Sequence, residues 1–262
     1  MMLAGGVEDS QSGVTDVLVP TITTIVTCMT DAERPFLAEA LRSVQSQTIP
    51  TRVTLCVSDV NDWVDEVLSG MQPGIDVLRL PLASLACIRN RALATVQTDL
   101  VAFLDGDDVW RPNKLRRQVA ALMSRELDVV ACKHVLIREE GTAYFYGFAM
   151  SVPMPSSWLG RTAIFRDRPF EDVRVGEDVL LWRRLTAEVR WEVLNGFLLR
   201  YRVREGSLSQ LTPSKKRKLA YARRSRIPGM RPVLLGASFS ANIGLKIRSD
   251  IATMAGKGGR DR

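Results

Sequence analysis

The hydrophobic positions of the first half of the chain follow two alternating periods. Residues 22–28 form an apolar, β-branched run without helical spacing, which predicts a strand buried on both faces. From Pro35 to Gln47 apolar residues recur at helical spacing, with Thr30 or Asp31 as the expected N-cap. The same alternation predicts strands at 53–58, 75–80 and 99–104 and helices at 61–69, 84–96 and 112–124. Four strand–helix units in a row predict a doubly wound α/β sheet.

The pattern becomes less regular beyond residue 128. Strands are expected at 128–137, 143–148 and 161–165 and a helix at 177–188, so this half should complete a mixed sheet. The composition shifts abruptly at Pro213, after which two helices are expected in a basic tail. The predicted organisation is an N-terminal extension (1–19), a main domain (20–212, with halves 20–125 and 126–212) and a C-terminal tail (213–262).

Composition is typical of a folded globular protein, with 46% hydrophobic and 25% charged residues. No apolar run approaches the roughly 18 residues of a membrane-spanning helix, and the first residues lack a secretory-signal pattern. These features predict a cytoplasmic location, with a peripheral position on the inner face of the membrane as a further option. The four cysteines show no C-x-x-C spacing, so we expect buried free thiols: Cys28, Cys56, Cys87 and Cys132.

The basic residues are concentrated in the tail. Residues 213–262 contain 13 Lys or Arg against two acids and so carry +11; the whole chain carries +7, which leaves −4 on residues 1–212. Such a tail could bind an anionic membrane surface or nucleic acid, or it could be a solvated face. A further alternative is that the helices of the tail pack against the main domain, either of the same chain or of the partner in a homodimer.

The strongest local motif is Asp105-Gly106-Asp107-Asp108, which follows the hydrophobic strand at 99–104. Adjacent carboxylates at a buried strand end repel one another unless a cation compensates them. Mg²⁺ or Mn²⁺ would do so, and each leaves coordination positions open for a substrate diphosphate. The alternative is that these acids cap the helix expected from about Trp110.

Other enzyme classes lack their motifs in this chain. No G-x-G-x-x-G follows the first strand, and there is no Gly-Lys-Ser/Thr phosphate loop. His134, inside the strand expected at 128–137, is the only histidine, so no multi-His zinc site can form and no Ser-His-Asp or Cys-His arrangement is indicated, which argues against metalloprotease and hydrolase chemistry. A nucleotidyltransferase-like enzyme, and a nucleic-acid or membrane-binding module that uses the tail, stay as alternatives.

Over roughly residues 20–210 the chain resembles a family 2 glycosyltransferase of the GT-A fold, a Rossmann-like mixed sheet flanked by helices. The resemblance is carried by features in the same order along the chain: the strand ending at Thr27, the helix at 36–48, the strand closing on Asp59, Arg89-Asn90, the run 101–112, Gly176-Glu177-Asp178, and the segment 201–209. It implies a transferase that moves a sugar from a nucleotide-diphosphate sugar, a UDP-sugar above all, to the hydroxyl of a glycan, lipid-linked or other acceptor.

The same resemblance implies roles for individual residues. Thr27 and Asp59 would hold the nucleotide base, Asp105 the ribose, and Arg89 would face the diphosphate. Asp107 and its neighbour Asp108 would hold the metal. In the pair Glu177-Asp178, Asp178 would be the general base that deprotonates the acceptor during an inverting displacement, although both acids could simply complement a helix N-terminus.

Three positions depart from the family pattern or add to it. A single acid, Asp59, stands where two adjacent acids are usual, so this position does not specify the nucleotide base. Arg204 stands where a histidine is common; Arg cannot ligate a cation but can pair with phosphate, so the metal would be held loosely or partly replaced. Trp158, in a Pro- and Ser-rich loop, is a candidate for stacking on an acceptor sugar.

Overall fold

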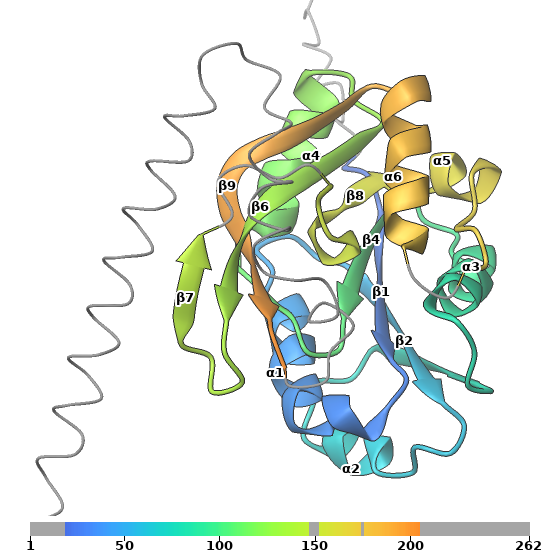
Figure 1. Ribbon diagram of the computed structural model, residues 1–262, viewed down its shortest axis with the longest axis vertical. Helices are drawn as coiled ribbons and strands as arrows, with labels where there is room; N and C mark the ends of the chain where they lie inside the picture. Colours follow the sequence, from blue (N-terminus) through green and yellow to red (C-terminus); the bar gives the residue numbers. More distant parts are fainter. Residues whose placement is uncertain (1–18, 147–151, 174–175, 205–262) are drawn as a thin grey trace, which may run out of the picture.

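A computed structural model describes residues 19–146, 152–173 and 176–204 of the chain. The expected basic helices of the tail lie outside the described residues, as does all but one residue of the expected N-terminal extension. The described residues form one mixed sheet with helices on both faces, as the sequence predicts (Figure 1). The domain boundaries stay predictions.

The first half of the sheet is parallel. Its strands are β1 (Ile22–Cys28), β2 (Arg52–Ser58), β3 (Ile75–Leu80) and β4 (Leu100–Asp105), in the spatial order β3-β2-β1-β4. The expected strand ranges are therefore confirmed in this half. Parallel pairing places the carboxyl ends of all four strands along one edge of the sheet, which is where ligands bind in open α/β folds.

Within the described residues, the second half continues the sheet through four antiparallel pairs and one parallel pair. Beyond β4 come β8 (Leu159–Arg161), β6 (Val129–Ile137), β9 (Trp191–Arg202) and β5 (Val109–Trp110). Strand β7 (Ala143–Tyr146) lies off this order and pairs with the last residues of β6. Strand β9 runs parallel to β6, and its long course brings the residues that follow it back to the ends of β1 and β4.

Two layers of helices cover the sheet (Figure 1). One face carries α1 (Arg34–Gln45), α2 (Val64–Ser69) and α4 (Lys114–Ser124), and the other carries α3 (Leu85–Thr95), α5 (Thr162–Asp167) and α6 (Glu177–Glu188). Two short 3-10 turns complete the described elements: η1 (Asp31–Glu33) immediately before α1 and η2 (Pro155–Ser157) before β8.

Strand β4 shows why the sequences of the parallel strands are continuous apolar runs. Leu100, Ala102 and Leu104 pack into the core under α1 and α4, whereas Val101 and Phe103 pack into the core under α3 and α6. Because both faces are buried, no polar alternation is possible. Fixed packing on both sides holds the residues that follow β4 in place.

Three sequence expectations are wrong or incomplete. The strand expected at 161–165 is wrong: β8 ends at Arg161, the N–H of Thr162 makes a last bond to the carbonyl of Asp99, and the chain then forms α5. The sequence pattern predicts no strand where β9, the longest strand in the described chain, lies. Trp158 is fully buried against Phe170 and Trp182, with its indole N–H bonded to the carbonyl of Pro153, so it is a core residue and not a sugar platform.

The expectation of buried free thiols is confirmed for three of the four cysteines. All four are free; Cys28, Cys56 and Cys132 are buried, whereas Cys87 is half-buried. His134 lies in β6, and burial lowers its pKa to about 4. None of the helices in the described ranges combines the length and apolar character needed to cross a membrane.

Candidate functional site

The site begins where β1 and β4 end side by side. Thr27 and Asp105 are direct partners in the register of these strands. The next residue, Gly106, donates its N–H to the carbonyl of Thr27 at 2.8 Å. A Cβ at this position would lie 3.0 Å from the Cβ of Cys28 and 3.1 Å from the Thr27 oxygen, so any larger residue would push the turn a few tenths of an ångström away from β1.

Asp105 is held by groups from three elements. Its Oδ1 accepts from the hydroxyl of Thr27 at 3.0 Å and from Nη2 of Arg89 at 2.7 Å. Its backbone N–H donates to the hydroxyl of Ser156 in η2 at 3.1 Å. The side chain is 24% exposed, so its second oxygen is the one available to a ligand.

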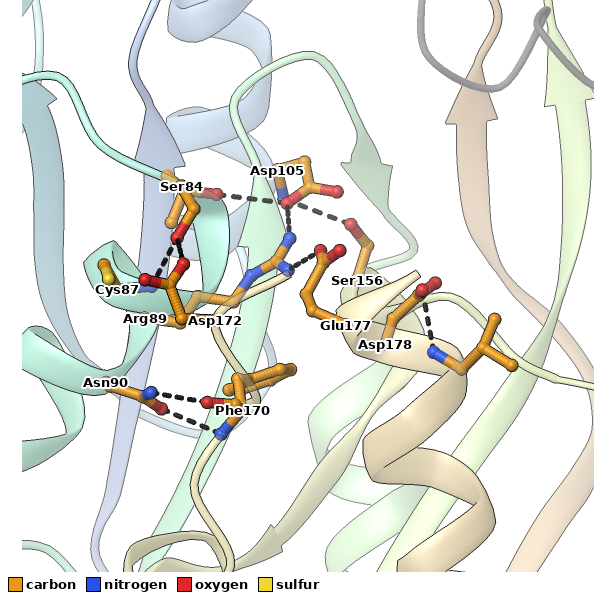
Figure 2. Close-up of polar contacts among 12 residues, drawn as sticks. Ser84, Cys87, Arg89, Asn90, Asp105, Ser156, Phe170, Asp172, Glu177 and Asp178 are labelled. Carbon is orange, nitrogen blue, oxygen red and sulfur yellow. Dashed lines mark hydrogen bonds and ion pairs between the residues drawn. The ribbon is translucent and has the colours of Figure 1, made fainter. Parts of the chain in front are cut away.

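Arg89 extends this network to α6. Its guanidinium is buried on α3, and Nη1 donates to Oε1 of Glu177 at 3.0 Å (Figure 2). Glu177 and Asp178 form the first turn of α6, which begins where the sequence predicts, after a left-handed Gly176. Burial, and then the charge of Glu177, raises the pKa of Asp178 above the usual value for an aspartate.

The two acids after Gly106 point to different partners. Asp107 accepts from Nε of Arg204 at 2.6 Å through Oδ2, and its side chain is 12% exposed. Asp108 is fully buried, and its Oδ1 accepts the backbone N–H of Arg202 at 2.9 Å. Among the described residues its Oδ2 has no hydrogen-bond partner.

Carboxylates outnumber cations in this region. Burial raises the pKa of Asp107 and of Asp108, the latter well above its ordinary value, and neighbouring acids add to both shifts. Glu33, which accepts N–H groups of Met29 and Thr30 at the entry to α1, has its pKa raised to about 7 by burial, with Asp107 contributing. The site therefore has a deficit of positive charge.

Helix capping does not explain the acidic motif. The helix that follows is α4, whose N-cap is Asn113, and strand β5 separates it from Asp108. The alternative stated for Asp105 to Asp108 is thus excluded. For Glu177 and Asp178 the first-turn position is confirmed, which is compatible with either interpretation of those two acids.

Asp59 lies at the same edge of the sheet but apart from this network. It follows β2, its N–H donates to the carbonyl of Leu80 at 2.9 Å, and its side chain is exposed. Since β1 lies between β2 and β4, Thr27 separates Asp59 from Asp105.

Two site residues were not identified from the sequence. Arg202 is buried, donates from Nε to the carbonyl of Asp107 at 2.8 Å and also contacts Glu39, so it fixes the acidic turn to β9 and α1. Ser156 supports Asp105 from a segment whose composition indicates only a loop. Neither position has a local pattern that signals its role, because the partner of each is distant in sequence.

The model of one protein family, described as Glycosyl transferase family 2, matches residues 24–183. The chain belongs to glycosyltransferase family 2. Among curated family relatives, the putative teichuronic acid biosynthesis glycosyltransferase TuaG of Bacillus subtilis is 31% identical over 114 residues, 42% of this chain and 45% of that protein. The succinoglycan biosynthesis protein ExoW of Rhizobium meliloti is 30% identical over 135 residues, 49% of this chain and 41% of that protein.

A more distant relative, the O-antigen biosynthesis glycosyltransferase WbnJ of Escherichia coli, is 24% identical over 56% of this family 2 chain and 62% of its own length. The chain thus spans about half the length of the curated relatives it matches. In fold it is similar to S. aureus TarS 1–349, crystallised with UDP-GlcNAc, with a TM-score of 0.61 at 17% identity over 84% of this chain and 71% of that one. This likeness confirms the expected GT-A architecture.

Proposed function

We propose that the protein transfers a sugar from a nucleotide-diphosphate sugar to an acceptor hydroxyl. The observation that carries this proposal is the continuous network from Thr27 through Asp105 and Arg89 to Glu177, next to Asp178. A nucleotide would bind at the strand ends, and the network connects these ends with helix α6. That helix presents Asp178, a carboxylate with a raised pKa. Membership of family 2 supports the same conclusion.

The donor half of the proposed site has groups suited to a nucleoside. We assign the ribose to the second oxygen of Asp105, since the first already accepts from Thr27 and Arg89. The base would lie between Thr27 and the exposed Asp59. UDP is the proposed nucleotide because the structurally similar TarS was crystallised with UDP-GlcNAc and with UDP. Arg89 would then act on the donor through Asp105.

The acidic turn fits a divalent ion held together with the donor. Among the described residues no three His, Cys, Asp or Glu side chains converge on a metal position. Mg²⁺ and Mn²⁺ need only one or two carboxylates when substrate phosphates and water complete their shell. We assign this role to Asp107, which reaches solvent, with the buried Asp108 behind it. When bound, the ion would stabilise the diphosphate leaving group.

Arg204 is the second proposed source of positive charge for the diphosphate. Its guanidinium contacts Asp107, and its side chain is 16% exposed, so it borders the place where the phosphates would lie. A guanidinium can pair with two phosphate oxygens. The metal would therefore share its task with Arg204 and would compete with it for Asp107.

Asp178 is the proposed general base. The acceptor oxygen would attack the anomeric carbon, the bond from that carbon to the diphosphate oxygen would break, and the acceptor proton would pass to the carboxylate of Asp178. A raised pKa suits this task, because a base with a higher pKa takes the proton more readily. Attack opposite the leaving group inverts the configuration of the sugar.

The acceptor is proposed only by class. The named functions of TuaG, ExoW and WbnJ concern teichuronic acid, succinoglycan and O-antigen, so a hydroxyl of a surface glycan or its lipid-linked precursor is the proposed acceptor. Recruitment of that acceptor to an anionic membrane through residues 213–262 would account for the charge of the tail, with the protein on the cytoplasmic face.

The catalytic part of the proposal can be tested without an acceptor, since water can accept the sugar slowly. We expect the protein to release UDP from one of UDP-GlcNAc, UDP-glucose and UDP-galactose. Asp178→Asn should bind UDP as the wild type does but release it about a hundred-fold more slowly. Glu188→Gln, at the other end of α6, is the matched control and should behave as wild type. Equal rates for Asp178→Asn and wild type would remove Asp178 from the role of base.

A further inference from the structure

Helix α3 holds the segment that leads into α6. The side-chain amide of Asn90 donates to the carbonyl of Phe170 at 2.8 Å, and the N–H of Phe170 donates back to Asn90 at 2.9 Å. At the N-cap of α3, the hydroxyl of Ser84 donates to Asp172 at 2.6 Å (Figure 2). These three hydrogen bonds fix residues 170–172 against α3 before the chain reaches Glu177.

Arg89 projects from the same helix and joins two carboxylates that are distant in sequence. Its Nη2 lies 2.7 Å from Asp105 and its Nη1 lies 3.0 Å from Glu177. The guanidinium carbon also lies 5.4 Å from the centroid of the Phe170 ring. The Arg89 side chain is 2% exposed, so its charge depends on these acids for compensation.

This geometry does not suit a direct diphosphate ligand. Both terminal nitrogens of Arg89 already bind carboxylates, and its Nε is buried without a hydrogen-bond partner among the described residues. The side chain is 2% exposed, so a phosphate could reach its remaining N–H groups only if the guanidinium moved away from the two carboxylates, and each of these would be costly to leave unpaired. Arg89 is better placed to act through Asp105 and Glu177.

We propose that Arg89 is a positioning residue that couples occupancy of the donor site at Asp105 to the order of the N-terminal turn of α6, where Asp178 lies. The proposal rests on the proposed function, because it assigns the ribose to Asp105. A ligand bound to the free oxygen of Asp105 fixes the position of that carboxylate. The ion pair with Asp105 then fixes Arg89, and the ion pair between Arg89 and Glu177 orders the first turn of α6. The contiguous ion pairs supply the physical link that such coupling requires.

Hydrogen exchange measures this coupling without an acceptor or catalysis. We would follow a peptide that covers residues 176–185, with and without saturating UDP, in wild type, Arg89→Gln and Glu177→Gln. Arg89→Gln removes both ion pairs of Arg89, and Glu177→Gln removes only the pair between Arg89 and Glu177. The matched control is Arg190→Gln, which removes an exposed arginine that pairs with Glu126 on the surface. Calorimetry on the same samples gives the affinity for UDP.

The expected result is a UDP-induced slowing of exchange by about tenfold in wild type and Arg190→Gln. In Arg89→Gln and Glu177→Gln the slowing should fall below about twofold, while the affinity for UDP changes by no more than about threefold, since Thr27 still holds Asp105. A uniform loss of protection both with and without UDP would indicate a merely structural role and would overturn the proposal.

Other outcomes separate this inference from the proposed function. Retained UDP-induced slowing in Arg89→Gln, or no slowing in a wild type that binds UDP, overturns the coupling alone. A folded Arg89→Gln that no longer binds UDP makes Arg89 a direct donor ligand, which also overturns it. If wild type binds no nucleoside diphosphate, the proposed function fails and the inference fails with it. Should Arg89→Gln not fold, Glu177→Gln decides the question.

Discussion

At the scale of single residues, the site is organised by charge compensation between distant positions. Arg204 reaches Asp107 across 97 residues of sequence, and Arg89 reaches Glu177 across 88. The sequence places each of these residues in the candidate site through the family resemblance, but it carries no information on which carboxylate each guanidinium binds. That pairing depends on the course of β9 and on the approach of α6 to α3.

Replacement of Arg204 tests its proposed share in diphosphate binding. Arg204→Ala removes a positive charge beside the phosphates, so UDP affinity should fall several-fold, by about 1 kcal/mol. Because the substitution also frees Asp107, Mn²⁺ should matter more for UDP binding in the variant than in wild type. Calorimetry with Mn²⁺ and with a chelator measures both effects, and Arg204→Lys should recover part of the affinity. Unchanged binding in Arg204→Ala would contradict this role.

At the scale of elements, the sequence predicts regular strand–helix units well and irregular ones poorly. The four parallel strands are recognisable because burial on both faces makes them continuous apolar runs. Strand β9 is interrupted by polar residues such as Asn195 and by Gly196, and its pairing with β6 shifts in register, so no simple period marks it. The short run at 161–165 fits strand and helix equally, and only the turn at Thr162 decides between them.

Helix α4 contains a buried lysine whose titration makes the free energy of unfolding depend on pH. Lys114 is fully buried, donates to Gln118 at 2.8 Å and lies 3.8 Å from the centroid of the Trp110 ring. Burial lowers its pKa to about 7. Above pH 7 the unfolded chain therefore binds a proton at Lys114 that the folded chain does not, so the free energy of unfolding rises with pH until the unfolded pKa is reached.

The prediction is a difference between wild type and Lys114→Met, which keeps a similar volume without the charge. Between pH 7 and pH 8 the free energy of unfolding of wild type, relative to the variant, should rise by about 1 kcal/mol. Denaturant unfolding at several pH values in this range gives the comparison, in which the other titrating groups cancel. A difference that is constant with pH would show that Lys114 keeps its proton when folded.

At the scale of the whole molecule, the fold and the family follow from the order of weak signals along the chain. Each strand end alone is ambiguous, but their succession from Thr27 to Asp178 is specific, and the fold and the family match confirm it. What the sequence does not give is the connection between the halves. Arg89 and Asn90, identified as a pair, turn out to hold the donor half to the segment before α6. The acceptor and the part played by residues 213–262 stay proposals.

The central claim is that the edge formed by β1, β2 and β4 binds a nucleoside diphosphate with Asp107. Calorimetric titration of UDP, GDP and TDP, each with and without Mn²⁺, tests it most directly in wild type, Asp107→Ala and the surface control Asp65→Ala. We predict that UDP binds and that Mn²⁺ strengthens its binding in wild type and Asp65→Ala, with the metal-dependent part lost in Asp107→Ala. Absence of binding by all three nucleotides under every condition would contradict the account.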